Sequence, residues 1–167
     1  MLKMKLVTKF LLAIIIGVAV ASCIEEAEPY IPPTKAEEDA LLAEYLDTLT
    51  NRGLDIDTTA MGVYYIIDSI GNGTFPQDGD TCVVKYTGQF IDGSVFETTG
   101  NSTWEYVLGS ENLIDGWNDA TRLIDEEGSA FLIIPSELGY GTTGAGHIPP
   151  NTTTVFWIEM VEIKPHN

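Results

Sequence analysis

Leu113-Ile114-Asp115-Gly116-Trp117 is the stretch around which this 167-residue chain is organised. It has the pattern of a helix start, and Ile114 and Trp117 are three residues apart, which places them on one helix face. An indole there can form the floor of an apolar pocket, and a backbone N–H in the first turn of a helix can donate to a ligand. A tryptophan that only fills a hydrophobic core is more common than one that forms a pocket floor, so the surrounding sequence has to distinguish between these two roles.

Short β-rich runs broken by glycine surround this predicted helix. We expect the helix to extend from about residue 114 to residue 123, and we expect strands at residues 63–67, 81–90, 95–97, 104–108, 130–134 and 153–163. A glycine-rich loop, residues 139–150, precedes the last strand. The predicted fold of residues 54–167 is therefore α+β, with five or six strands wrapped around one core-facing helix.

A separate amphipathic helix is predicted for residues 34–53. Thr34 and Glu37 have the spacing of a capping box, in which each side chain accepts a hydrogen bond from the backbone N–H of the other residue. The apolar residues that follow at helical spacing are Leu42, Tyr45, Leu46 and Leu49, and Gly53 supplies a stop. Such a helix is only marginally stable by itself. We favour packing on its own domain over docking on a partner.

The first 33 residues have the features of a bacterial lipoprotein leader and tether. Three lysines precede an unbroken apolar run at residues 10–21, which is too short to span a bilayer as a mature helix but is typical of a signal peptide. The run ends in Val20-Ala21-Ser22-Cys23, which resembles the lipobox that precedes a lipidated cysteine. We therefore expect a signal peptide at residues 1–22 and an acidic, proline-rich tether at residues 23–33.

The expected location is the bacterial cell envelope, where a lipid on Cys23 anchors the protein to the outer membrane, on its periplasmic side or on the cell surface. The acids after Cys23 loosely resemble the surface-export signals of some Bacteroidetes lipoproteins, and a solvated charge run is the equal alternative. Cleavage before Cys23 would remove three of the eight Lys and Arg residues and none of the 25 acidic residues, which leaves a formal charge of −20. So acidic a chain repels phosphate groups, which argues against nucleic-acid binding and leaves the acyl chains as the membrane attachment.

Few residues are suited to acid–base, nucleophilic or metal chemistry. His147 and His166 are the only histidines, and neither has metal-ligand spacing from a cysteine or another histidine. Asp125-Glu126-Glu127 is expected to be a solvated acidic turn rather than a calcium site, because it lacks the full ligand series. Cys82 is the one cysteine besides Cys23, so we expect no internal disulfide and a buried, inert thiol. We expect no metal and no cofactor.

Five motifs carry a resemblance to a known family. They are Val83-Val84-Lys85-Tyr86-Thr87-Gly88, Asp92-Gly93-Ser94-Val95-Phe96-Glu97-Thr98-Thr99, Leu113-Ile114-Asp115-Gly116-Trp117, Leu138-Gly139-Tyr140-Gly141 and Ile148-Pro149-Pro150-Asn151. Their order and spacing, over about residues 62–163, resemble the FKBP-type peptidyl-prolyl cis-trans isomerases. The resemblance implies a curved antiparallel sheet of five or six strands that closes over one short helix, with a substrate pocket between helix and sheet.

The resemblance also implies a role for each matched residue. The catalytic set would be Tyr86, Phe96, Glu97, Ile114, Trp117 and Tyr140, and the substrate-binding set would be Trp104, Leu113, Ile148 and Phe156. Trp117 would lie under the proline ring of the substrate. The backbone N–H of Ile114 and the hydroxyl of Tyr140 would hold carbonyl groups of the bound peptide, and Ile148 would lie at the loop rim. Glu97 stands where the family usually has Asp.

The implied activity is that of an isomerase, or rotamase, which assists the folding of envelope or exported proteins without a cofactor. Its partners would be proline-containing proteins and peptides, and the macrolide inhibitors of the family are candidate ligands. Two alternatives stay open. One is a binding module or holdase chaperone that keeps the pocket with little turnover, and the other is a structural envelope lipoprotein whose helix at residues 34–50 docks a partner.

Overall fold

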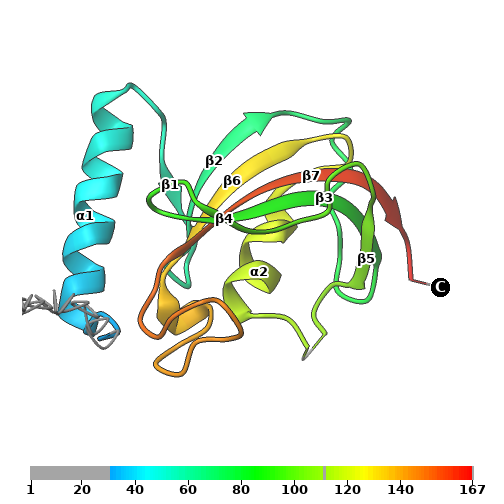
Figure 1. The fold of residues 1–167 in the computed structure, drawn as a ribbon. Coiled ribbons are helices and arrows are strands. Elements are labelled where there is room, and N and C mark those ends of the chain that lie inside the picture. Colours follow the sequence, from blue (N-terminus) through cyan, green and yellow to red (C-terminus); the bar gives the residue numbers. More distant parts are fainter. Residues whose placement is uncertain (1–30, 111, 167) are drawn as a thin grey trace, which may run out of the picture. The chain divides into compact units, whose positions relative to one another are not determined.

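A single antiparallel sheet forms the frame of the protein (Figure 1). The computed structural model describes residues 31–110 and 112–166, so the predicted signal peptide, Cys23 and most of the predicted tether lie outside the described residues. In chain order the elements are α1 (Lys35–Asn51), β1 (Asp57–Thr58), β2 (Tyr64–Ser69), β3 (Thr81–Phe90), β4 (Val95–Thr98), β5 (Trp104–Val107), α2 (Asp115–Ala120), η1 (Thr121–Leu123), β6 (Ser129–Ile134), η2 (Ser136–Leu138) and β7 (Thr154–Lys164). The strand order is β1-β2-β6-β7-β3-β4, and β5 also pairs with β3. None of the described helices has the length and apolar character needed to cross a membrane.

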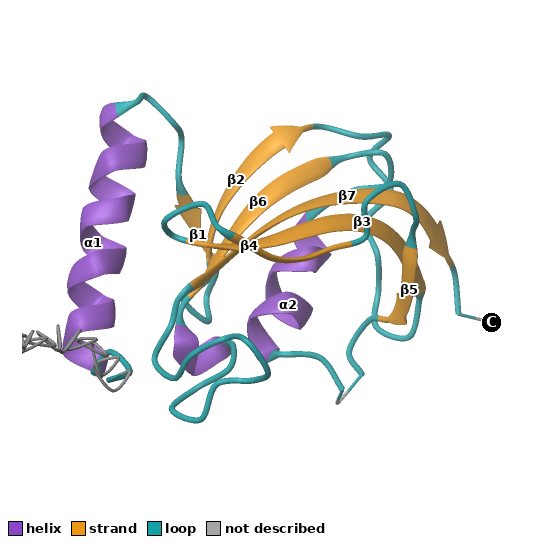
Figure 2. Ribbon diagram, viewed as in Figure 1, coloured by secondary structure: helices purple, strands orange, loops and turns teal. Residues whose placement is uncertain are grey.

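β3 and β7 are the central strands and set the curvature of the sheet. They pair along the whole of β3, with a bulge between Val83 and Val84. The other edge of β3 is shared, because β5 pairs with residues 81–84 and β4 with residues 87–89. A bulge bends a strand and increases its twist, and the sheet accordingly curves over α2 (Figure 2).

The predicted α+β class and the antiparallel sheet around one helix are confirmed, whereas the predicted number of strands is wrong. The sheet has seven strands rather than five or six. The strand that the sequence does not reveal is β1, whose two residues pair with Tyr64 and Tyr65 of β2. Two residues are too few to show the alternation by which a strand is recognised.

α2 and the short 3-10 helix η1 match the extent of the predicted helix and form the main core with the sheet. Trp117 and Ala120 are buried in this core. Gly116 allows the close approach of α2 to β6, because a Cβ at that position would lie 2.5 Å from the Cγ2 atom of Ile134. Cys82 is fully buried in the same core, and burial raises the pKa of its thiol, as expected of an inert cysteine.

α1 packs on the other face of the sheet. Thr34 caps the helix through the predicted capping box. Leu42 and Leu49 are buried against Ile133 of β6 and Val155 of β7. The next residue along each of these strands belongs to the main core, because successive strand residues point to opposite faces. The structure thus shows α1 packed on its own domain, the favoured expectation.

The acidic turn after η1 is only partly the solvated turn that the sequence favours: Glu127 is exposed, whereas Asp125 is buried and Glu126 is half-buried. Asp125 is only 5% exposed, and its carboxylate accepts hydrogen bonds from the backbone N–H groups of Gly71 at 2.9 Å and Gly73 at 2.8 Å. Glu126 accepts from the N–H of Ile163 in β7 at 2.9 Å. Backbone N–H groups that leave water need acceptors, and these two carboxylates supply them to segments from distant parts of the sequence.

Candidate functional site

A cavity of about 350 Å³ lies between the start of α2 and the sheet. Its lining comes from segments that are far apart in the sequence: β3, β4, β5, the start of α2 and the turn before it, the loop after η2, and β7. The lining residues are Tyr86, Glu97, Trp104, Asn112, Leu113, Ile114, Trp117, Tyr140 and Phe156. The structure therefore brings together eight of the ten residues that the sequence predicts for the site.

Trp117, the aromatic residue of α2, is buried beneath the cavity and has an exposed fraction of 3%. Four rings meet its indole edge-on, with centroid distances of 5.2 to 5.8 Å: Tyr86, Trp104, Tyr106 and Phe156. The ring quadrupole favours edge-to-face contacts of this kind. The indole is thus held in one orientation and gives the cavity a rigid apolar floor.

Two predicted site residues, Phe96 and Ile148, do not line the cavity. Phe96 instead packs edge-on against Phe156 at a centroid distance of 5.6 Å, and it covers Gly88, where a Cβ would lie 2.7 Å from its ring. Ile148 is 8% exposed and is held within its loop by two backbone hydrogen bonds to Ala145, of 2.8 and 2.9 Å. Phe96 therefore supports one wall from the side, and Ile148 belongs to the packing of the loop itself.

Glu97 and two tyrosine hydroxyl groups form the polar edge of the cavity. Burial and the neighbouring Glu97 carboxylate both raise the pKa of the Tyr86 hydroxyl. Burial and the same negative charge raise the pKa of the Tyr140 hydroxyl. Both hydroxyls therefore stay protonated at neutral pH and keep their ability to donate hydrogen bonds.

Two donors at the cavity are available to a ligand. Within residues 31–110 and 112–166, no group accepts a hydrogen bond from the backbone N–H of Ile114, whose carbonyl already accepts from Trp117 and Asn118 in the first turn of α2. Unpaired N–H groups are the normal consequence of a helix start. The Tyr140 hydroxyl likewise has no hydrogen-bond partner among the described residues.

Asn112 and Thr99 are residues of the site to which the sequence assigns no role. Asn112 lines the cavity just before α2, and asparagine is common in turns, so it gives no signal of its own. Thr99 belongs to the second of the five motifs, but the motif does not show what it does. It follows β4 and holds Tyr86, because its Oγ1 atom accepts from the Tyr86 N–H at 3.0 Å and its own N–H donates to the Tyr86 carbonyl at 3.0 Å.

The arrangement is suited to binding and orienting a ligand rather than to acid–base chemistry. Among the described residues, its lining contains one carboxylate and no histidine, lysine or cysteine. No cluster of side chains able to hold a metal ion occurs in the part of the chain that the structure describes. Mostly apolar walls with a few fixed polar groups are typical of sites for small apolar ligand groups.

Known proteins match this chain over most of its length. The family model for FKBP-type peptidyl-prolyl cis-trans isomerase matches residues 72–161. A probable FKBP-type peptidyl-prolyl cis-trans isomerase of Haemophilus influenzae is 34% identical over 147 residues, which cover 87% of this chain and 59% of the relative. The isomerase FkpA of Escherichia coli K12 is 34% identical over 130 residues, which cover 78% of this chain and 48% of the relative. The chain thus spans about half the length of the curated relatives it matches.

Two solved structures share the fold. The crystal structure of FkpA from Escherichia coli has a TM-score of 0.66 and 32% identity, and the match covers 78% of this chain and 62% of that one. The crystal structure of a peptidyl-prolyl cis-trans isomerase from Pseudomonas syringae has a TM-score of 0.70 and 28% identity, and the match covers 81% of this chain and 99% of that one. Together with the family model and the aromatic cavity, these similarities show that the chain belongs to the FKBP-type peptidyl-prolyl cis-trans isomerase family.

Proposed function

We propose that this protein accelerates cis/trans rotation about Xaa–Pro bonds in other proteins. The observation that carries the proposal is the aromatic cavity with Trp117 as its floor and the unpaired Ile114 N–H and Tyr140 hydroxyl in its lining. A proline ring matches the apolar floor, and the peptide carbonyls on either side of it are acceptors for the two donors. Membership of the family supports the same assignment.

The reaction needs no acid, base or metal. Rotation about an Xaa–Pro bond is slow because it breaks the amide resonance, with a barrier of about 18–20 kcal/mol. At the twisted midpoint the carbonyl is less polarised than in the planar amide, so this state loses less by leaving water. A dry aromatic cavity therefore binds the twisted state better than the planar one, which lowers the barrier. The two donors fix the peptide carbonyls and reduce the entropic cost of reaching that state.

A comparison of two tryptophans tests the proposal. Exchange between the cis and trans forms of a short Xaa–Pro peptide is followed by NMR with catalytic amounts of the protein. Trp117→Phe replaces the indole at the cavity floor with a smaller ring, so it should lower kcat/KM. Trp157→Phe is the matched control, because Trp157 donates to Asp68 at 3.2 Å and lies outside the cavity lining. Equal kcat/KM values for the two variants would contradict the proposal.

The same peptide separates catalysis from simple binding. A wild-type protein that binds the peptide, detected by tryptophan fluorescence, but leaves its exchange rate unchanged would be a binding module or holdase and not an isomerase. A macrolide inhibitor of the family should compete with the peptide, because both would occupy the one aromatic cavity. Loss of exchange on adding the macrolide would support an isomerase that acts through this cavity.

We further propose that the protein works in the bacterial cell envelope, held there by a lipid on Cys23, on proline-containing segments of envelope or exported proteins. The support is the sequence of the leader: the basic residues, the apolar run of residues 10–21 and the cysteine that follows. The wild-type protein should incorporate a palmitate analogue and enter a detergent phase, and Cys23→Ser should do neither. Labelling that persists in Cys23→Ser would refute the anchor.

A further inference from the structure

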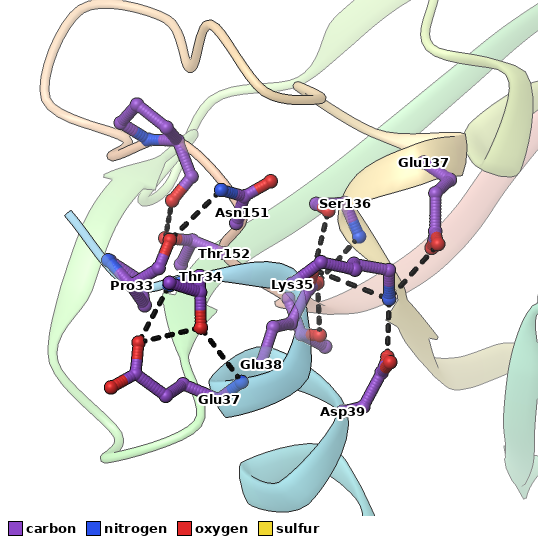
Figure 3. A network of polar contacts seen from close by, with 12 residues as sticks. Pro33, Thr34, Lys35, Glu37, Glu38, Asp39, Ser136, Glu137, Asn151 and Thr152 are labelled. Carbon is purple, nitrogen blue, oxygen red and sulfur yellow. Dashed lines mark hydrogen bonds and ion pairs between the residues drawn. The ribbon is translucent and has the colours of Figure 1, made fainter.

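A buried carboxylate joins α1 to the loop that carries Tyr140 (Figure 3). Glu38, in the first turn of α1, is 2% exposed. It accepts hydrogen bonds from the backbone N–H of Ser136 at 2.7 Å, from the hydroxyl of Ser136 at 2.5 Å and from the hydroxyl of Thr153 at 2.7 Å. A buried charge is stable only where it is paired and hydrogen-bonded. The three donors, which come from segments outside α1, and the ammonium group of Lys35 at 3.5 Å together satisfy that condition.

Two further contacts reinforce the junction. The ammonium group of Lys35 lies 3.0 Å from the carboxylate of Glu137. The side-chain amide of Asn151 donates to the carbonyl of Pro33, just before α1, at 2.9 Å. The first turn of α1 and the residues before it therefore hold the loop of residues 136–153 at both of its ends (Figure 3).

Tyr140 lies between these two held ends. The N–H of Gly141, the next residue, donates to the carbonyl of Ser136 at 2.8 Å. The carbonyl of Gly141 accepts from the N–H of Asn151 at 2.9 Å. The backbone beside Tyr140 is thus bonded to two residues that α1 and its preceding residues hold directly.

We infer that Glu38 is a positioning residue for Tyr140, so that α1 holds the Tyr140 loop in place as well as covering the sheet. This inference rests on the proposed isomerase function. A hydroxyl donor is effective only within a narrow range of distance and angle, and the loop of residues 136–153 is rich in glycine, which gives a backbone many accessible conformations. Fixing both ends of the loop reduces the number of conformations and keeps the Tyr140 hydroxyl directed at the site.

Three variants separate this role from a purely structural one. Glu38→Ala removes all three contacts. Glu38→Gln keeps one oxygen for the Ser136 N–H and the Thr153 hydroxyl, and its amide can donate to the Ser136 hydroxyl. Glu44→Ala removes an exposed carboxylate from the same helix and is the matched control. We expect kcat/KM on an Xaa–Pro peptide to fall about 2- to 13-fold in Glu38→Ala, the range for one oriented hydrogen bond. It should fall less in Glu38→Gln and stay at the wild-type value in Glu44→Ala.

A double-mutant cycle supplies the decisive measurement. In a Tyr140→Phe background the hydroxyl that Glu38 positions is absent, so Glu38→Ala should change kcat/KM by less than about twofold. The same loss in both backgrounds would overturn the inference. If circular dichroism shows that Glu38→Ala is unfolded, the cycle is run with Ser136→Ala, which removes one donor to the carboxylate and leaves Glu38 in place.

Amide NMR separates a failure of this inference from a failure of the proposed function. The signals of Gly139 and Gly141 should shift or broaden in Glu38→Gln and stay unchanged in Glu44→Gln, whether or not the protein shows isomerase activity. Unchanged signals in Glu38→Gln would overturn the positioning role. Wild-type protein without activity, but with the expected NMR changes, would overturn the proposed function and leave the coupling of α1 to the loop established.

Discussion

Replacing Tyr140 with phenylalanine tests one hydrogen-bond donor of the cavity in isolation. The substitution removes a hydroxyl group and keeps the ring, which is partly buried against the main core. No described residue is hydrogen-bonded to this hydroxyl, so the folded protein loses no internal contact. The effect of the change should therefore fall on the bound peptide.

The expected magnitude follows from the value of a single hydrogen bond. A bond of this kind contributes about 0.5–1.5 kcal/mol net, and about 1.36 kcal/mol corresponds to a factor of ten in rate. The value of kcat/KM should therefore fall about 2- to 13-fold. A loss in kcat at constant KM would place the bond in the twisted state alone. The free energy of unfolding should change by less than about 0.5 kcal/mol.

NMR exchange spectroscopy on an Xaa–Pro peptide measures kcat/KM for the variant. Tyr45→Phe is the matched control, because Tyr45 is partly buried in the cluster between α1 and the sheet and lies outside the cavity lining. Wild-type activity in Tyr140→Phe would refute the role of the hydroxyl. An equal loss in Tyr45→Phe would refute it too, since the effect would then not be specific to the cavity.

Three further predictions concern the frame around the cavity. Gly116→Ala should lower the free energy of unfolding in urea by about 1–3 kcal/mol, because the new methyl group would lie 2.5 Å from a methyl carbon of β6; a loss below about 0.5 kcal/mol would show that α2 can shift to make room. Asp125→Ala should lower the free energy of unfolding by about 1–3 kcal/mol, because two backbone N–H groups lose their acceptor, whereas the exposed-site control Asp47→Ala should leave stability unchanged; equal effects of the two would contradict this role of Asp125. Burial by itself would raise the pKa of Glu38, but the hydrogen bonds that it accepts and the charge of Lys35 lower this pKa below the usual 4.5. The stabilisation by ionised Glu38 is therefore present above about pH 4.5 and is lost as the pH falls through the folded-state pKa of Glu38. The difference in unfolding free energy between wild type and Glu38→Gln should shrink from about pH 7 to pH 3. A difference that stays constant over this range would contradict the contribution of the Glu38 charge.

Several elements of the fold are predictable because their signals are local. The capping box at Thr34 and the strand Thr81–Phe90 depend on residues only a few positions apart, and the structure has both. β1 is not predictable, because its two residues are too few to show an alternating pattern of apolar and polar side chains. Its pairing with β2 depends on the turn that brings the two segments together.

The members of the candidate site are predictable for a different reason. Five motifs in a fixed order point to the family, and six of their residues meet at one cavity, where Trp104 and Phe156 join them. The motifs do not say which side chains face the cavity. Phe96 belongs to a motif, yet it packs on Phe156 and over Gly88 instead, and that choice depends on how close β4 and β7 lie to β3.

The fold class, most of the elements and most of the residues that line the cavity follow from patterns in the sequence. The burial of particular charges, and the segments that those charges hold, follow from the folded chain. Asp125 accepts from N–H groups 54 and 52 positions away, and Glu38 accepts from donors 98 and 115 positions away. A carboxylate leaves water only where folding delivers enough donors to replace its hydration, and no pattern of neighbouring residues records donors that come from so far along the chain.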